Sequence, residues 1–116
     1  MGEEKNFKVP KNIPEDAVDV FLLIMDSHTK IRIVRDLLSG TKSFKQLSAS
    51  TKCFDWQLKK YLKFLTEYGI VKTKIYPGIP MVIEYTLTPI GELMKPAINS
   101  MAEWGRGYRV SARAKY

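Results

Sequence analysis

Two β-branched segments separated by a turn of proline and glycine dominate the second half of this 116-residue chain. Residues 70–76 (IVKTKIY) and 81–87 (MVIEYTL) have strand composition, and residues 77–80 (PGIP) have the composition of a turn. We therefore predict one β-hairpin. Because the sequence on both sides of it has helical spacing, this hairpin belongs to a mainly helical fold.

Four helices are predicted before the hairpin. The first begins near Pro14, a residue suited to a first helical turn, and continues through residues 20–25 (VFLLIM), which are apolar all round and should be buried on more than one side. The second follows residues 26–28 and ends near Gly40. The third begins at Ser43, the first residue of a Ser-x-x-Gln capping box.

The fourth predicted helix runs from about residue 55 to residue 68. Its leucines, Leu58, Leu62 and Leu65, have the spacing of an inward face. After the hairpin, Thr88 is expected to cap a last helix that has Pro89 at its first position. Pro96 should kink this helix or shorten an early turn.

This order of elements, helices followed by a two-stranded hairpin, is that of a winged helix-turn-helix. We predict an α+β, mostly helical fold in which the hairpin is the wing and the N- and C-terminal helices mediate dimerisation. Residues 13–105 would form this single domain, between a flexible N-terminal segment, residues 1–12, and a basic C-terminal tail, residues 106–116. In such folds the second helix of the turn lies in the major groove, and the hairpin reaches the flanking backbone or minor groove.

The positive charge is concentrated where this fold would contact DNA. Residues 42–74 carry eight lysines and only two acids, in a chain of formal net charge +7. Such a surface attracts a polyanion, because neutralising phosphates releases condensed counterions. The candidate DNA-binding residues are Lys42, Lys45, Lys52, Trp56, Gln57, Lys59, Lys60, Lys63, Lys72, Lys74 and Tyr76.

Each part of this surface also has a plainer interpretation. The lysines of the fourth helix can form a solvated face, and those of the first strand can protect an exposed sheet edge. Trp56 and Tyr61 can pack beneath the helix instead of touching DNA. Gln57 is the strongest candidate to read a base, since a glutamine amide can bond an adenine edge in bidentate fashion.

Five short motifs stand out in the helices and the wing. They are LLSGTKSF (37–44), YGIV (68–71), YPxxP (76–80), EYxLT (84–88) and EWG (103–105). With these motifs, residues 15–108 resemble the HxlR family of bacterial and archaeal transcription regulators. The resemblance implies the winged fold and a role in transcription.

The resemblance also implies a homodimer built from the first and last helices, whose paired recognition helices bind a roughly two-fold operator. The residues support this independently, because the last helix carries an apolar stripe that so small a domain has little means to bury, and such a patch indicates an interface. The two reading helices should lie about one DNA turn apart. The predicted interface residues are Phe21, Ile24, Met94, Ile98, Met101 and Trp104.

Two positions depart from the family's pattern. Family members that sense oxidants carry a cysteine near the start of the first helix, where this chain has Asp16, and residues 26–29 (DSHT) replace the family's Gly-Gly-Lys-Trp. The resemblance therefore implies nothing about sensing here. Cys53 has two interpretations: a sensor thiol whose pKa is lowered by a helix end and Lys52, or a small apolar residue that fills a turn.

Other classes of function are disfavoured. No apolar run approaches the roughly 20 residues of a membrane-spanning helix, and the polar N-terminus is unlike a signal peptide, which indicates the cytoplasm. One cysteine excludes an intrachain disulfide and a multi-cysteine zinc site. The common catalytic and phosphate-binding motifs do not occur, so neither an enzyme nor a cofactor or metal is expected.

We therefore expect a homodimeric regulator that binds double-stranded DNA sequence-specifically and represses transcription by blocking polymerase access. Two alternatives stay open. One is a winged-helix protein-interaction module whose basic face meets an acidic protein without binding DNA, and the other is an RNA-binding protein. The sequence identifies neither an operator nor an effector molecule.

Overall fold

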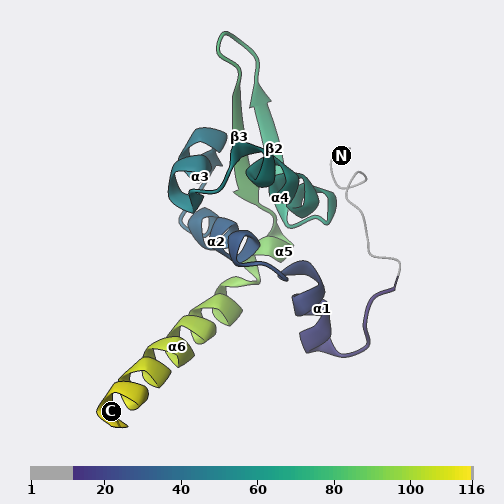
Figure 1. Ribbon diagram of the computed structural model, residues 1–116. Helices are drawn as coiled ribbons and strands as arrows, with labels where there is room; N and C mark the ends of the chain where they lie inside the picture. Colours follow the sequence, from purple (N-terminus) through teal and green to yellow (C-terminus); the bar gives the residue numbers. More distant parts are fainter. Residues whose placement is uncertain (1–11, 116) are drawn as a thin grey trace.

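The computed structural model describes residues 12–115, and the wing and the last helix project from opposite ends of a small helical body (Figure 1). The segment predicted to be flexible, residues 1–12, lies outside the described residues except for its last position. The elements are α1 (Ala17–Ile24), α2 (His28–Leu37), β1 (Lys42–Ser43), α3 (Phe44–Thr51), α4 (Asp55–Glu67), β2 (Val71–Tyr76), β3 (Val82–Leu87), α5 (Pro89–Glu92) and α6 (Lys95–Lys115).

The start of α1 differs from the prediction. The helix begins at Ala17 instead of near Pro14, because Asp16 provides the cap. The Asp16 carboxylate accepts hydrogen bonds from the backbone N–H groups of Val18, at 2.8 Å, and Asp19, at 3.3 Å. A side-chain acceptor of this kind satisfies N–H groups that have no partner within the helix, and proline offers none.

The predicted capping box at the start of α3 is confirmed. Ser43 Oγ accepts the N–H of Gln46 at 3.1 Å, and Gln46 Oε1 accepts the N–H of Ser43 at 2.9 Å. The helix ends at Thr51, and its C-cap residue, Lys52, has a left-handed backbone at φ 57°. The chain then turns into α4, so α3 and α4 form the helix-turn-helix.

The sheet has three strands in the order β1-β3-β2, one strand more than predicted. β1 has only two residues, which pair with Tyr85 and Glu84 of β3, and so short a strand has no alternation to detect in the sequence. β2 and β3 pair in antiparallel fashion over their whole length, from Val71 with Leu87 to Tyr76 with Val82. The predicted hairpin is therefore confirmed, and β2 is an edge strand of this sheet.

The core lies between the helices and the inner face of the sheet. The three inward leucines of α4, Leu58, Leu62 and Leu65, are buried, as their spacing predicted. Their burial sets the rotation of α4, so that its opposite face points to solvent. The other buried apolar residues are Ile24, Met25, Ile33, Val34, Leu37, Leu47, Ile70, Val71, Tyr85, Leu87 and Ile98.

The last helical segment is divided into a short α5 and a long α6. Thr88 caps α5 as predicted, since its Oγ1 accepts the N–H of Gly91 at 3.1 Å. Pro96 lies in the first turn of α6, where its missing N–H removes no intrahelical bond.

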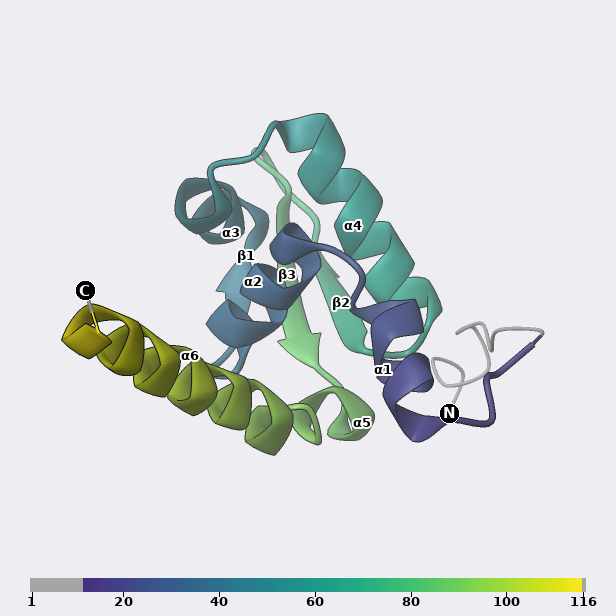
Figure 2. The same ribbon diagram turned by 60° about the horizontal axis from the view of Figure 1, so that its bottom comes forward.

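The predicted C-terminal tail was wrong as a separate segment, because α6 continues to Lys115. The arginines and alanines after residue 105 are good helix formers and outweigh the two nearby glycines. α6 extends away from the helical body in both ribbon views (Figures 1 and 2). Although α6 has 21 residues, neither it nor another helix among the described residues is apolar enough to cross a membrane.

Gly91 marks a close approach between α5 and the segment that joins α4 to β2. A Cβ atom at this position would overlap the carbonyl oxygen of Ile70 and lie 3.1 Å from Cδ2 of Leu87. That carbonyl also accepts the N–H of Thr88 at 3.0 Å, which restricts its movement. We expect Gly91→Ala to lower the free energy of unfolding by about 1–3 kcal/mol in urea denaturation at fixed protein concentration.

The control for this prediction is Gly107→Ala in α6, where an added Cβ would meet no atom within 4 Å. Alanine at an exposed helical position should raise the free energy of unfolding, by about 0.5–1 kcal/mol. Opposite signs are expected for the two variants. Equal stability of the Gly91→Ala variant and the parent would contradict the close approach.

Candidate nucleic-acid interface

α4 presents a polar face opposite its buried leucines. Successive residues of an α-helix are about 100° apart, so Trp56, Lys60 and Lys63 lie on the side remote from the core. All three side chains are exposed, Trp56 by 63%. Trp56 therefore does not pack beneath the helix, whereas Tyr61 is half-buried against the core.

Gln57 is less exposed than we expected from the sequence. It lies in the first turn of α4, the part of a recognition helix that meets base edges. However, its side chain is half-buried, on the flank of α4 that also carries Tyr61 one turn later. Trp56 is the more exposed side chain at this end of the helix.

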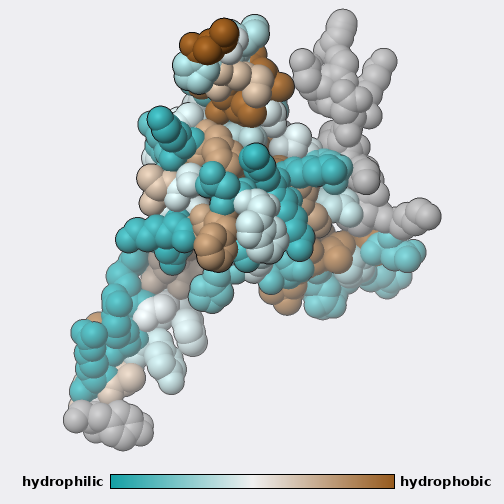
Figure 3. Space-filling model, turned by 45° about the horizontal axis from the view of Figure 1, so that its top comes forward, coloured by the Kyte–Doolittle hydropathy of each residue, from teal (hydrophilic) through white to brown (hydrophobic). Residues whose placement is uncertain are grey.

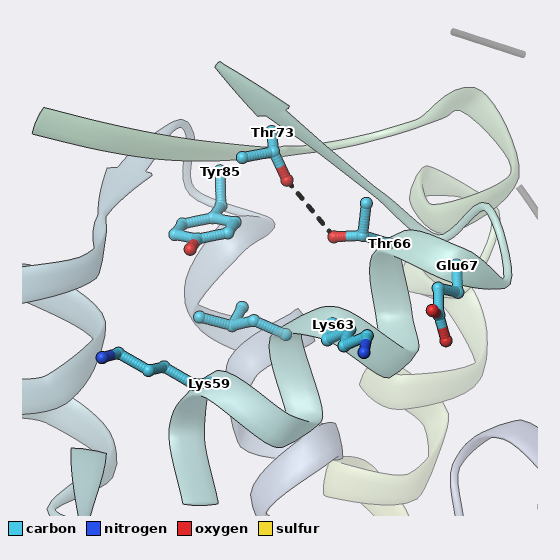
Figure 4. Close-up of a pocket in the computed structure, with 7 residues that line it drawn as sticks. Lys59, Lys63, Thr66, Glu67, Thr73 and Tyr85 are labelled. Carbon is cyan, nitrogen blue, oxygen red and sulfur yellow. Dashed lines mark hydrogen bonds between the residues drawn. The ribbon is translucent and has the colours of Figure 1, made fainter. Parts of the chain in front are cut away.

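A shallow cavity of about 270 Å³ separates α4 from the wing. Lys59, Lys63 and Thr66 line it from α4, and Thr73 lines it from β2 (Figure 4). The two threonine hydroxyl oxygens are 3.3 Å apart. Two ammonium groups beside hydroxyl donors suit a phosphate oxygen, and they outnumber the one carboxylate in the lining, that of Glu67. The threonines were not predicted, and only their contact across the two elements brings them into the site.

The lysines of the wing belong to a different surface. Thr73 faces α4, and side chains alternate between the two faces of a strand, so Lys72 and Lys74 lie on the outer face of the sheet. Tyr76 shares that face, with its ring centroid 5.1 Å from Nζ of Lys74. Because β2 is an edge strand, protection of the edge remains an available role for these lysines.

The remaining predicted DNA-binding residues surround α3. Lys45 and Lys52 are exposed at its two ends, whereas Lys42 in β1 is half-buried. The start of α3 lies near α4, because Nζ of Lys59 is 6.0 Å from the ring centroid of Phe44. Lys45, Lys52 and the α4 lysines are thus carried by the two helices of the helix-turn-helix.

The lysines of α4 and β2 form no ion pair with any residue that the structure describes. Within residues 12–115 the single ion pair joins Lys30 to Asp26, with 2.8 Å between Nζ and Oδ1. The hydrogen bond from the Lys30 ammonium lowers the pKa of the Asp26 carboxyl group. Lys30 is almost fully buried and lies over the ring of Phe64 on α4, 3.4 Å from its centroid, so it braces α2 against α4.

The six predicted interface residues are not all on the surface. Ile24 and Ile98 are buried in the core of the single chain, because the start of α6 and the end of α1 pack onto it. Phe21 and Met94 are half-buried, while Met101 and Trp104 are exposed.

Sequence reasoning left out several exposed apolar side chains of the terminal helices. The ring of Tyr108 stacks on that of Trp104, with 5.3 Å between centroids. α1 is not buried on more than one side in the single chain. The exposed apolar residues of α1, α5 and α6 are Val18, Leu22, Leu23, Ile90, Met101, Trp104, Tyr108 and Val110, and Leu93 is exposed between α5 and α6.

The architecture and this basic helix agree with a family comparison. Residues 24–113 match the model of the HxlR-like helix-turn-helix family. The chain belongs to this family. The HxlR-like chain is therefore a winged helix-turn-helix transcription regulator, which is a class of DNA-binding protein. The proteins to which it is similar are named as transcriptional regulators and not as enzymes.

Named relatives of the HxlR-like chain occur in bacteria and archaea. It is 32% identical over 91 residues to the HTH-type transcriptional regulator YvaP of Bacillus subtilis, covering 78% of this chain and 81% of YvaP. An HTH-type transcriptional regulator of Methanothermobacter thermautotrophicus is 26% identical over 93 residues, which cover 79% of this chain and 71% of that protein.

Solved structures share the fold of the HxlR-like chain. A transcriptional regulator of the MarR family from Porphyromonas gingivalis W83 has a TM-score of 0.75 and 28% identity, covering 85% of this chain and 96% of that one. The reduced form of the redox regulator HypR has a TM-score of 0.77 and 25% identity, and the match covers 85% of this chain and 99% of that one.

In the present chain, Cys53 is half-buried between α3 and α4. Its Sγ atom is 3.4 Å from Oγ1 of Thr51.

Proposed function

We propose that this HxlR-like protein binds double-stranded DNA sequence-specifically as a homodimer and represses transcription by blocking polymerase access. The observation that carries the proposal is the exposed face of α4, where Lys59, Lys60 and Lys63 have no ion-pair partner among the described residues. A helix of this kind fits the major groove, which is about 12 Å wide. The cavity beside it offers two of these lysines, Lys59 and Lys63, and two hydroxyl groups to a phosphate.

Different residues would position the protein and read the sequence. Contacts from lysines to phosphates fix the register of a protein on the duplex but carry little sequence information. Trp56 and Gln57, at the N-terminal end of α4, are the side chains proposed to reach base edges. Lys45 and Lys52 extend the phosphate contacts along α3.

The homodimer is supported by apolar surface that the single chain leaves exposed. Leu22 of α1 is 53% exposed, and Trp104 of α6 is 70% exposed although tryptophan is strongly favoured at protein interfaces. Exposed apolar surface of this extent indicates an interface. A two-fold dimer through α1 and α6 would present two copies of α4 to a two-fold operator.

Fluorescence anisotropy tests the proposal directly. The purified protein is titrated onto duplex DNA from its own upstream region and onto a scrambled duplex of the same composition, across a range of salt concentrations. We expect tighter binding to the upstream duplex at physiological salt, with a steep negative dependence of log affinity on log salt. A matching RNA duplex is included as a competitor.

Three other outcomes would count against the proposal. Equal weak binding to both duplexes would reduce the site to a non-specific basic surface. Preference for the RNA competitor would favour an RNA-binding role. Failure to bind any duplex at low salt would favour the protein-interaction module, because the phosphate contacts of a DNA-binding protein are strongest there.

A further inference from the structure

The tip of the wing is uncharged and apolar in a chain that is otherwise rich in lysine. Residues 75–83 (IYPGIPMVI) contain no charged side chain. At the tip, Ile79 is fully exposed and Met81 is 57% exposed. The space-filling view shows hydrophobic surface gathered at the end of the wing (Figure 3).

Nothing in the described part of the chain covers this tip. The hairpin extends beyond α3 and α4, and its end is remote from α1 and α6 (Figure 1). The turn is also stiff, since Pro77 and Pro80 each restrict one φ angle. Gly78 has φ 152°, a conformation that L side chains rarely adopt. A rigid projection on which several apolar side chains are exposed together, Ile79 and Met81 among them, indicates a contact.

We propose that Ile79 is a wedge that enters the minor groove beside the half-site read by α4 and partly unstacks one base step. This inference rests on the proposed DNA-binding function. Apolar side chains, isoleucine among them, act in this way in minor-groove proteins and bend the duplex by about 20–90°. Ile79 is the most exposed of the apolar side chains at the tip, so it is the one placed to enter a minor groove about 6 Å wide.

The position of the tip favours nucleic acid over a protein or a membrane. The wing adjoins the lysine-bearing face of α4 across the cavity formed with Thr73, so a duplex bound to α4 would pass close to the tip. Lys74, nearer to the tip than Lys72, is placed to contact a phosphate at the groove wall. A second copy of the chain already has a larger apolar surface to cover on α1 and α6.

A wedge makes a specific prediction about sequence preference. Pyrimidine–purine steps such as TA unstack and kink most easily, so they lower the deformation energy at the site of insertion. The protein should then prefer a TA step at the position under the wing, although an isoleucine side chain makes no hydrogen bond to a base. Replacing that step by AA should weaken binding by about five- to tenfold.

The test uses 2-aminopurine placed in turn at each step that flanks the bound half-site of the upstream duplex. Unstacking raises the fluorescence of this base, and energy transfer between dyes at the duplex ends reports bending. We expect the parent and Ile79→Leu to raise the fluorescence at one step and to bend the duplex. Ile79→Ser should do neither, should lose the preference for TA over AA, and should keep the salt dependence.

Lys63→Gln is the matched control, since it removes a phosphate contact and leaves the tip intact. It should lower the salt dependence while keeping the unstacking signal and the bend. Ile79 makes no core contact, so circular dichroism should show that Ile79→Ser folds like the parent.

Each of the following outcomes would contradict the proposal that Ile79 acts as a wedge. Unstacking by Ile79→Ser at the parental level, or no unstacking by the parent on a duplex that it binds, would exclude it while leaving the proposed function intact. A change in oligomeric mass for Ile79→Ser in sedimentation would assign the tip to a second copy of the chain. Absence of duplex binding by the parent in the anisotropy titration would remove the proposed function and the wedge together.

Discussion

Replacing Lys59, Lys60 and Lys63 with glutamine is expected to weaken binding to duplex DNA about a hundredfold at 0.15 M salt. Each lost phosphate contact removes about 0.9 from the slope of log affinity against log salt, so the slope should become shallower by nearly 3. The three side chains are exposed, and within residues 12–115 none of them takes part in an ion pair. Their loss should therefore leave the free energy of unfolding almost unchanged.

The matched control removes the same number of charges elsewhere. Arg106, Arg109 and Arg113 are exposed on the C-terminal part of α6, and this part of the helix lies far from α4 and the wing (Figure 1). Their triple replacement by glutamine should change the slope much less. Equal loss of affinity in the two triple variants would show that net charge, and not the face of α4, determines binding.

Trp104→Glu is expected to convert the dimer to monomers and to weaken operator binding by about 10²- to 10⁴-fold. The indole ring is 70% exposed and stacked on Tyr108, which is the arrangement of an interface anchor. A carboxylate buried there without a partner would oppose association. Because a monomer engages only one half-site, it loses the gain in affinity that comes from linking two recognition helices.

Analytical ultracentrifugation measures the mass, and anisotropy measures the affinity. Asn99→Glu introduces the same charge on the opposite side of α6, so it should leave both quantities near those of the parent. The dimer proposal would fail if the parent itself sedimented as a monomer. If Trp104→Glu remained a dimer, the dimer interface would lie on another surface of the chain.

The two variants have different signatures. Loss of the α4 lysines should change affinity and salt dependence but not mass, whereas loss of the Trp104 contact should change mass and affinity but not the salt dependence of each remaining half-site contact. Measuring both properties on both variants therefore separates the DNA surface from the dimer surface.

Local patterns were sufficient for most elements of the fold. The capping box at Ser43, the Thr88 cap and the leucine spacing of α4 each depend on residues within a turn or two, and the structure confirms all three. The boundaries that failed depend on competition between neighbours. Asp16 moved the start of α1 away from Pro14, and good helix formers carried α6 through the predicted tail to Lys115.

The candidate site was only partly predictable for the same reason. The exposed lysines of α4 follow from the helical period once the inner leucines are known, because a helix with one buried stripe must expose the other side. The cavity between Thr66 and Thr73 could not be foreseen, since it depends on how β2 packs against α4. The wing tip, in contrast, can be recognised in the sequence as a segment without charged residues, 75–83.

By itself the sequence determined the order of the main helices and the hairpin, the winged helix-turn-helix class and the family, because each rests on short-range spacing, caps and contiguous motifs. Tertiary structure alone decided which lysines share a surface. Alternation and helical period place each set of lysines on one face, but only the packing of β2 against α4 sets Lys72 and Lys74 on the outer face of the sheet and Lys59 and Lys63 beside the wing. It also decided that Ile24 and Ile98 belong to the core and Trp104 to the surface, since burial depends on which elements meet in space.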